Sequence, residues 1–180
     1  MSVGCVQVID IGKWESNRKM LEDDIFVPYT STKETYHSTG KLASRLNDMD
    51  LVVGFNNHTF DNNVICEFAG GDQEFLFNSF DILEDLVART DIKYLTNLDD
   101  LTETTLAEGK DCSISENAPD LWAKGEKQKV IDQCLGDVEL TAKIFMFGVE
   151  NGYVLVKPNK ADLFGNMVLK VPVDWCKKIK

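Results

Sequence analysis

The chain has 180 residues, of which 43% are hydrophobic, so it is long enough to bury the core of one domain. Its formal net charge of −11 excludes a protein that coats nucleic acid non-specifically through a broad basic surface. Residues 156–180 carry six lysines and two aspartates, a net charge of +4, so the remainder carries −15. An enzyme that holds metal ions in an acidic pocket and grips nucleic acid locally remains compatible with this composition.

Cysteine usage and hydropathy favour a cytoplasmic protein. The five cysteines are scattered, their number is odd and no CxxC pair occurs, which argues against a disulfide framework or a zinc site. The N-terminus lacks the basic, apolar and small-residue regions of a signal peptide. No apolar run approaches the roughly 20 residues that span a bilayer, so we expect no membrane partner.

The first part of the chain is expected to fold into strand, strand, helix, strand and helix. These elements are predicted over residues 2–11, 24–30, 38–49, 51–55 and 62–68. The first strand is rich in Val and Ile, and Ser38, Thr39 and Gly40 offer an N-cap for the first helix.

The second part is expected to be mainly helical and to end in a hairpin. A strand at 74–79 precedes helices at 82–89, 98–107 and 126–150, with an irregular loop at 108–118, and strands at 153–157 and 167–173 joined by a turn at 162–166. Asp81 is well placed to cap the helix that follows it. Strands interleaved with helices predict a mixed α/β sheet with helices on its faces and a C-terminal β-hairpin. We expect one domain over residues 1–155, with a basic hairpin or tail, 156–180, packed on it.

Two aspartates are the main candidate functional residues. Residues 51–61 read as a buried strand that ends in a turn and delivers the carboxylate of Asp61 to the edge of the sheet, although Asp61 is also a good helix N-cap. Asp137 lies in the middle of the long helix, near the edge of its buried face, where a surface acid is the alternative interpretation. A strand-end Asp followed by an Asp on a late helix is typical of nucleases that bind two Mg²⁺ ions through carboxylates from separate elements.

These segments resemble the motifs of one enzyme family. Residues 53–61, with the sequence VGFNNHTFD, are similar to the second motif of the DEDD (DnaQ-like) 3′-5′ exonucleases of the ribonuclease H-like superfamily, in particular its predicted-exonuclease branch. Residues 134–141, CLGDVELT, resemble the third motif. The resemblance covers about residues 50–155 and includes connecting segments at 98–101, 105–110, 122–125, 147–148 and 151–153.

The resemblance implies a ribonuclease H-like fold and an Mg²⁺- or Mn²⁺-dependent exonuclease that acts on a single-stranded DNA or RNA end. Asp61 and Asp137 would be metal ligands. Asn56 and His58 are further candidates to contact the substrate strand, and His58 could also touch a metal; the alternative interpretation is that Asn56 satisfies backbone groups of the turn and that His58 is a polar turn residue. The family also uses an Asp-x-Glu pair on its first strand. Here Asp10 is the available strand-end aspartate, and Gly12 occupies the position of the glutamate.

Two features depart from the family pattern. The residue four positions before Asp137 is Gln133, where the family has Tyr or His; Gln can hydrogen-bond a water or the substrate but cannot act as a general base. The family also places three strands and a helix before its second motif, and this sequence shows two strands and a helix. Either residues 2–11 have become the central strand, or a partner chain donates the missing strand, or the chain begins inside a longer gene product.

The sequence therefore supports two main functional hypotheses. The first is a metal-dependent 3′-5′ exonuclease. The second is a catalytically inactive relative that serves as a structural or interaction module in a nucleic-acid-processing complex. A third hypothesis, that the acidic surface is a decoy for a basic protein, rests on net charge alone.

Overall fold

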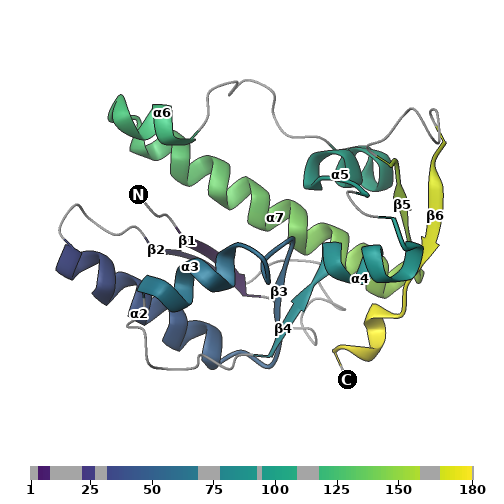
Figure 1. Ribbon diagram of the computed structural model, residues 1–180, viewed down its shortest axis with the longest axis horizontal. Helices are drawn as coiled ribbons and strands as arrows, with labels where there is room; N and C mark the ends of the chain where they lie inside the picture. Colours follow the sequence, from purple (N-terminus) through teal and green to yellow (C-terminus); the bar gives the residue numbers. More distant parts are fainter. Residues whose placement is uncertain are drawn as a thin grey trace.

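The structure is a computed structural model that describes residues 4–8, 22–26, 32–68, 78–92, 95–108, 118–158 and 167–179. Side chains are described from residue 40 onward within these ranges, except that of Phe68. Helices alternate with short strands along the described chain (Figure 1), so the mixed α/β class predicted from the sequence is confirmed.

The elements of the described chain are short apart from two long helices. In chain order they are β1 (Gly4–Val8), β2 (Glu22–Phe26), α2 (Thr32–Asn47), β3 (Val52–Gly54), α3 (Asp61–Phe68), β4 (Ser79–Asp81), α4 (Ile82–Thr90), α5 (Leu98–Leu106), α6 (Ala118–Ala123), α7 (Lys127–Asn151), β5 (Tyr153–Val156), β6 (Leu169–Pro172) and the 3₁₀ helix η1 (Trp175–Lys177).

The strands of the described residues form three separate pairs, where the sequence predicted one mixed sheet. β1 pairs with β2 and β5 pairs with β6, both antiparallel, whereas β3 and β4 run parallel. The parallel pair matches Val52 with Ser79 and Gly54 with Asp81, so both strands end side by side. The β5–β6 pair confirms the two strands of the expected hairpin; the turn predicted at 162–166 lies outside the described residues.

Two elements have other boundaries than the sequence predicted, and one helix was not predicted. Helix α2 begins at Thr32 and runs through residues 38–40, where the sequence predicted its N-cap. An established helix tolerates Ser, Thr and Gly at a cost of about 1 kcal/mol or less each, and the packing of α2 against α3 and β2 offsets this cost. β4 covers 79–81 because its pairing with β3 sets its position, whereas the predicted strand covered 74–79. Helix α6, which the sequence analysis missed, is six residues long and buries only Leu121, too little for a periodic signal.

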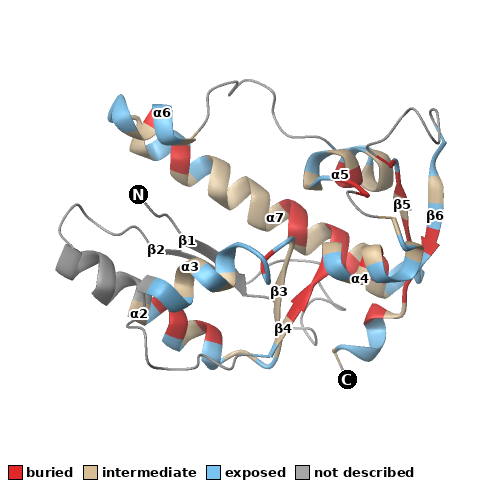
Figure 2. Cartoon of the chain, viewed as in Figure 1, coloured by how far each residue is buried: buried red, intermediate tan, exposed pale blue. Residues whose placement is uncertain are grey.

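Helix α7 is the central element of the fold. It contacts α5, α6, β1, β3, β5 and η1 and crosses most of the molecule diagonally in Figure 1. Its buried side chains lie mainly in its second half, where Leu140, Ile144, Phe145 and Met146 face the core (Figure 2). Gly152 ends the helix in the left-handed conformation, as predicted, and donates its N–H to the carbonyl of Gly148.

The C-terminal segment packs into the same core. Trp175 is completely buried, stacks on Phe145 with ring centroids 5.7 Å apart, and meets Phe80 edge-on at 5.9 Å. Phe80 and Phe145 are thus both buried in the core. Residues of β4, α4, α5, α7, β5, β6 and η1 form one hydrophobic cluster, and Val53 of β3 packs against it.

Candidate functional site

The candidate site is built around the loop that joins β3 to α3, residues 55–60, which we call the 55–60 loop. It begins after Gly54, where an added Cβ would lie 2.5 Å from Cγ of Asn57, so only glycine allows the loop to fold back this closely. Asn57 is 4% exposed, and its Nδ2 donates to Oγ of Ser79 at 2.8 Å. Asn56 has φ of 60°, a left-handed conformation that Asn adopts more readily than most residues.

Asp61 is the first residue of α3 and follows this loop directly. Two turn hydrogen bonds lead into the helix, from the N–H of Phe60 to the carbonyl of Asn56 at 3.2 Å and from the N–H of Asn62 to the carbonyl of Asn57 at 2.9 Å. Asp61 therefore stands at the beginning of α3, separated from the end of β3 at Gly54 by the whole 55–60 loop. The phenyl ring of Phe60 beside it is 65% exposed.

The electrostatic environment of Asp61 opposes its ionisation. The residue as a whole is exposed, but neighbouring atoms withdraw its carboxyl from water, and this desolvation raises the pKa above the ordinary 3.8. A hydrogen bond with its own backbone N–H lowers the pKa, and the negative charge of Asp81 raises it further. Asp61 and Asp81 are thus near enough for their charges to repel each other.

Asp81 connects the 55–60 loop to α4. Its carboxylate is 3% exposed and accepts hydrogen bonds from two loop amides, that of Asn56 at 2.9 Å and that of His58 at 3.1 Å. It also caps α4, as the sequence predicted, by accepting from the amides of Leu83 at 2.9 Å and Glu84 at 3.2 Å. The cap was readable from the local sequence, whereas the link to a loop 23 to 25 residues earlier was not.

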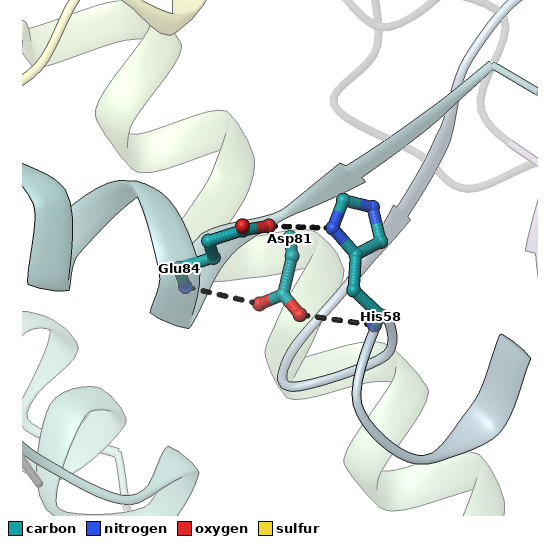
Figure 3. A group of neighbouring side chains, drawn as sticks. All are labelled: His58, Asp81 and Glu84. Carbon is teal, nitrogen blue, oxygen red and sulfur yellow. Dashed lines mark hydrogen bonds and ion pairs between the residues drawn. The ribbon is translucent and has the colours of Figure 1, made fainter. Parts of the chain in front are cut away.

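His58 lies on the outer side of this network. Its Nδ1 is 2.5 Å from Oε2 of Glu84 and its Nε2 is 3.2 Å from Oγ of Ser79. Figure 3 shows the imidazole facing the carboxylate of Glu84, while the backbone N–H of His58 points to Asp81. One potential ligand atom from each of His58, Asp81 and Glu84 lies within 4.8 Å of the others, so this group could hold a metal ion. The sequence analysis missed Glu84 as a neighbour of His58.

Asp137 and Gln133 lie one turn apart on α7, and both are half-buried. Helix α7 packs against β3, the strand that leads to the 55–60 loop. The hydroxyl of Thr141 donates to the backbone carbonyl of Asp137 at 2.7 Å, which is a helix contact and leaves the carboxylate out of that bond. Asn56 and His58 thus lie on the 55–60 loop, and Asp61 follows it directly at the start of α3. The helix of Asp137 packs against β3, the strand that leads to this loop. Asp10 lies outside the described residues.

The carboxylate oxygens of Asp61 and Asp81 are donors that suit a hard divalent cation. Mg²⁺ and Mn²⁺ prefer carboxylate oxygens, and a cation beside Asp61 would offset both the desolvation of its carboxylate and the repulsion from Asp81. Asp61 is exposed and therefore accessible to an ion and a substrate, whereas Asp81 already accepts four backbone hydrogen bonds. Asp61 is thus better placed to bind an ion, and Asp81 to hold the backbone.

Comparisons with protein-family models, with curated proteins and with solved structures find no match to this chain. In the described part of the chain, no helix has the combination of length and apolar character needed to cross a bilayer.

Proposed function

We propose that this protein is a metal-dependent 3′-5′ exonuclease of the DEDD type, acting on the end of a single-stranded nucleic acid. The observation that carries the proposal is the position of Asp61. Asp61 is an exposed residue whose carboxyl has a raised pKa, and it stands at the start of α3, directly after the loop that the carboxylate of Asp81 holds. The helix of Asp137 packs against β3, the strand that leads to this loop. Carboxylates with perturbed pKa values are common among catalytic groups.

Asp61 and Asp137 would hold Mg²⁺ or Mn²⁺, with Asp10 as the third carboxylate that the family resemblance implies. When bound, the metal supplies Lewis-acid stabilisation of the charge that develops on the phosphate oxygens. The protein side chains then bind and orient. The amide of Gln133 hydrogen-bonds the attacking water without removing its proton, and the exposed ring of Phe60 offers a surface on which a terminal base can stack. Asn56 and His58 contact the substrate strand.

The test is degradation of a single-stranded oligonucleotide in Mg²⁺, in Mn²⁺ and in EDTA. DNA and RNA strands are labelled at the 5′ end or the 3′ end, so that the direction of shortening is read directly. We expect stepwise shortening from the 3′ end that requires metal. Asp61→Ala and Asp137→Ala should each reduce the rate by at least about 100-fold, because even the residues behind metal ligands typically contribute 10- to 100-fold.

Asp132→Ala is the matched control, because Asp132 is an exposed aspartate on the same helix as Asp137. It should cleave at the wild-type rate. Absence of cleavage in either metal, or cleavage that Asp61→Ala leaves unchanged, would overturn the enzyme proposal. Retained binding of the labelled strand without cleavage would instead support the second candidate, a catalytically inactive module, which Gln133 in place of the family's Tyr or His favours.

A further inference from the structure

We propose that Asp81 is the positioning residue of this site: its buried carboxylate clamps the 55–60 loop and so fixes where Asp61 is presented. The inference rests on the proposed function for the role of Asp61. Asp81 touches neither substrate nor metal in this scheme, because it acts through the backbone of the loop.

The hydrogen bonds divide between the two oxygens of Asp81. Oδ1 accepts the amides of Leu83 and Glu84, which form the cap of α4, and also the amide of Asn56. Oδ2 accepts the amide of His58 alone. One buried carboxylate therefore joins the first turn of α4 to two residues of the 55–60 loop. Hydrogen bonds to an ionised acceptor are stronger than those to a neutral one, so this carboxylate can hold the loop amides although Asn56 and His58 are exposed residues.

The other end of β4 holds the same loop. Oγ of Ser79 accepts from Nδ2 of Asn57, and Nε2 of His58 lies 3.2 Å from the same oxygen. β4 consists of only three residues, and its first and last, Ser79 and Asp81, both bond to the loop. The register that pairs Gly54 with Asp81 brings the start of the loop level with the carboxylate.

The loop therefore cannot move far without breaking these partly buried hydrogen bonds. Asp61 directly follows the last residue of the loop, and the hydrogen bond described for its carboxylate is with its own backbone. Because a displacement of about 1 Å at a reacting group can cost about 100-fold in rate, holding the loop is equivalent to holding Asp61 in its working position.

Two substitutions separate the clamp from the cap. Asp81→Ser keeps a hydroxyl that accepts from the first-turn amides of α4, since serine is a good N-cap, but its single short side chain cannot also reach the loop amides. Asp81→Ala removes both functions. Asn97→Ala is the matched control, because Asn97 caps α5 by accepting the amide of Asp100 at 2.8 Å, and its described hydrogen bonds do not involve the 55–60 loop.

The first readout is hydrogen exchange of the amides of Asn56 and His58, which needs no activity. In Asp81→Ser we expect exchange at both amides to accelerate at least 10-fold, while the amides of α4 keep their protection. Asn97→Ala should leave both loop amides at the wild-type rate. Unchanged exchange of the two loop amides in Asp81→Ser would overturn the proposal and reduce Asp81 to a helix cap.

The second readout is the metal dependence of cleavage. Asp81→Ser should raise the half-saturating Mn²⁺ concentration by 10- to 100-fold and lower kcat, with little change in KM for the strand, whereas Asn97→Ala should change neither. A wild-type Mn²⁺ dependence in Asp81→Ser, alongside accelerated loop exchange, would overturn the link to Asp61. If the wild-type protein cleaves nothing, the proposed function fails, and the exchange readout still decides whether Asp81 clamps the loop.

Discussion

Asp61 carries a negative charge that the folded protein disfavours. Desolvation and the nearby charge of Asp81 raise its pKa, and only a hydrogen bond with its own backbone opposes them. Residues that perform chemistry are often retained at a cost in stability, because the charge needed for function has a better environment in water. At the scale of the residue, this conflict distinguishes Asp61 from Asp81, whose carboxylate is buried but surrounded by four donors.

A pH-dependent stability difference should follow from the raised pKa of Asp61. The folded state holds this proton more tightly than the unfolded state, so the free energy of unfolding falls as pH rises from about 3.8 through the raised folded-state value. Asp61→Asn lacks this titration. We expect it to melt at a higher temperature than the wild type at pH 7 and at the same temperature at a pH below that window.

Thermal melts followed by circular dichroism between pH 3 and pH 8 measure this difference. Asp132→Asn serves as the control, since Asp132 is an exposed aspartate on α7. If Asp61→Asn melts at or below the wild-type temperature at pH 7 without added metal, the ionised carboxylate of Asp61 does not destabilise the folded protein, and this prediction is wrong.

At the scale of the element, the turn after β3 depends on the absence of a side chain at Gly54. A Cβ there would lie 2.5 to 2.6 Å from two side-chain carbons of Asn57, which is buried and bonded to Ser79. Asn57 would have to move, and its hydrogen bond to the start of β4 would be lost. Gly54 is thus required because the side chain of Asn57 packs directly against it, and not because its backbone has an unusual conformation.

Gly54→Ala should therefore destabilise the protein by about 1–3 kcal/mol, the usual cost of forcing an extra carbon into a packed site. Urea unfolding measures the change. Gly40→Ala in α2 is the control, because an added Cβ there meets no described atom within 4 Å; in a helix interior this substitution should stabilise by roughly 0.5–1 kcal/mol. Equal stability of the two variants would show that Asn57 gives way easily.

Element boundaries show where local patterns were sufficient. Helix α4 was predicted with its cap, because Asp81 and the apolar residues after it form a local signal. Helix α2 was predicted too short, since its first six residues are polar and its length is decided by packing against α3 and β2. β4 was misplaced because a three-residue strand is defined by its partner, β3, and not by its own composition.

At the scale of the whole molecule, the C-terminal segment is joined to α4 and α7 mainly through the buried side chain of Trp175. Trp175 packs against Gly148 of α7 and donates its indole N–H to Oδ2 of Asp85 in α4 at 2.7 Å. Arg89 of α4 pairs with both Asp85 and Asp174, which strengthens the same junction at the surface. The basic end of the chain is therefore anchored through its aromatic residue, while its lysines at 170, 177 and 178 remain exposed.

Gly148→Ala should break this junction. A Cβ at Gly148 would lie 2.1 Å from Cε3 of Trp175, so the ring would have to leave its stack on Phe145 and its bond to Asp85. We expect a loss of about 1–3 kcal/mol in urea unfolding, with a changed tryptophan signal in near-ultraviolet circular dichroism.

Gly136→Ala is the control on the same helix, because an added Cβ there meets no described atom within 4 Å. It should stabilise α7 by roughly 0.5–1 kcal/mol and leave the tryptophan signal unchanged. A Gly148→Ala variant with wild-type stability and an unchanged signal would show that the C-terminal segment can shift without cost.

The sequence by itself determined the α/β class, the long helix α7, the cap of α4 and the strand and turn that precede Asp61. Each of these depends on residues that lie within a few positions of one another, so apolar periodicity, caps and glycines are enough to indicate them. The proximity of Asp61, Asp137 and Asp10 that the family resemblance implies stays a prediction.

Only the tertiary structure decided what surrounds Asp61. The bonds from Asp81 to the 55–60 loop, the contact between His58 and Glu84, and the closure of Asn57 onto Ser79 join residues 22 to 26 positions apart. Such contacts require β3 and β4 to be paired in one register, and a register of two three-residue strands is set by packing rather than by any local pattern. The candidate acid could therefore be recognised in the sequence, whereas the residue that holds it in place could not.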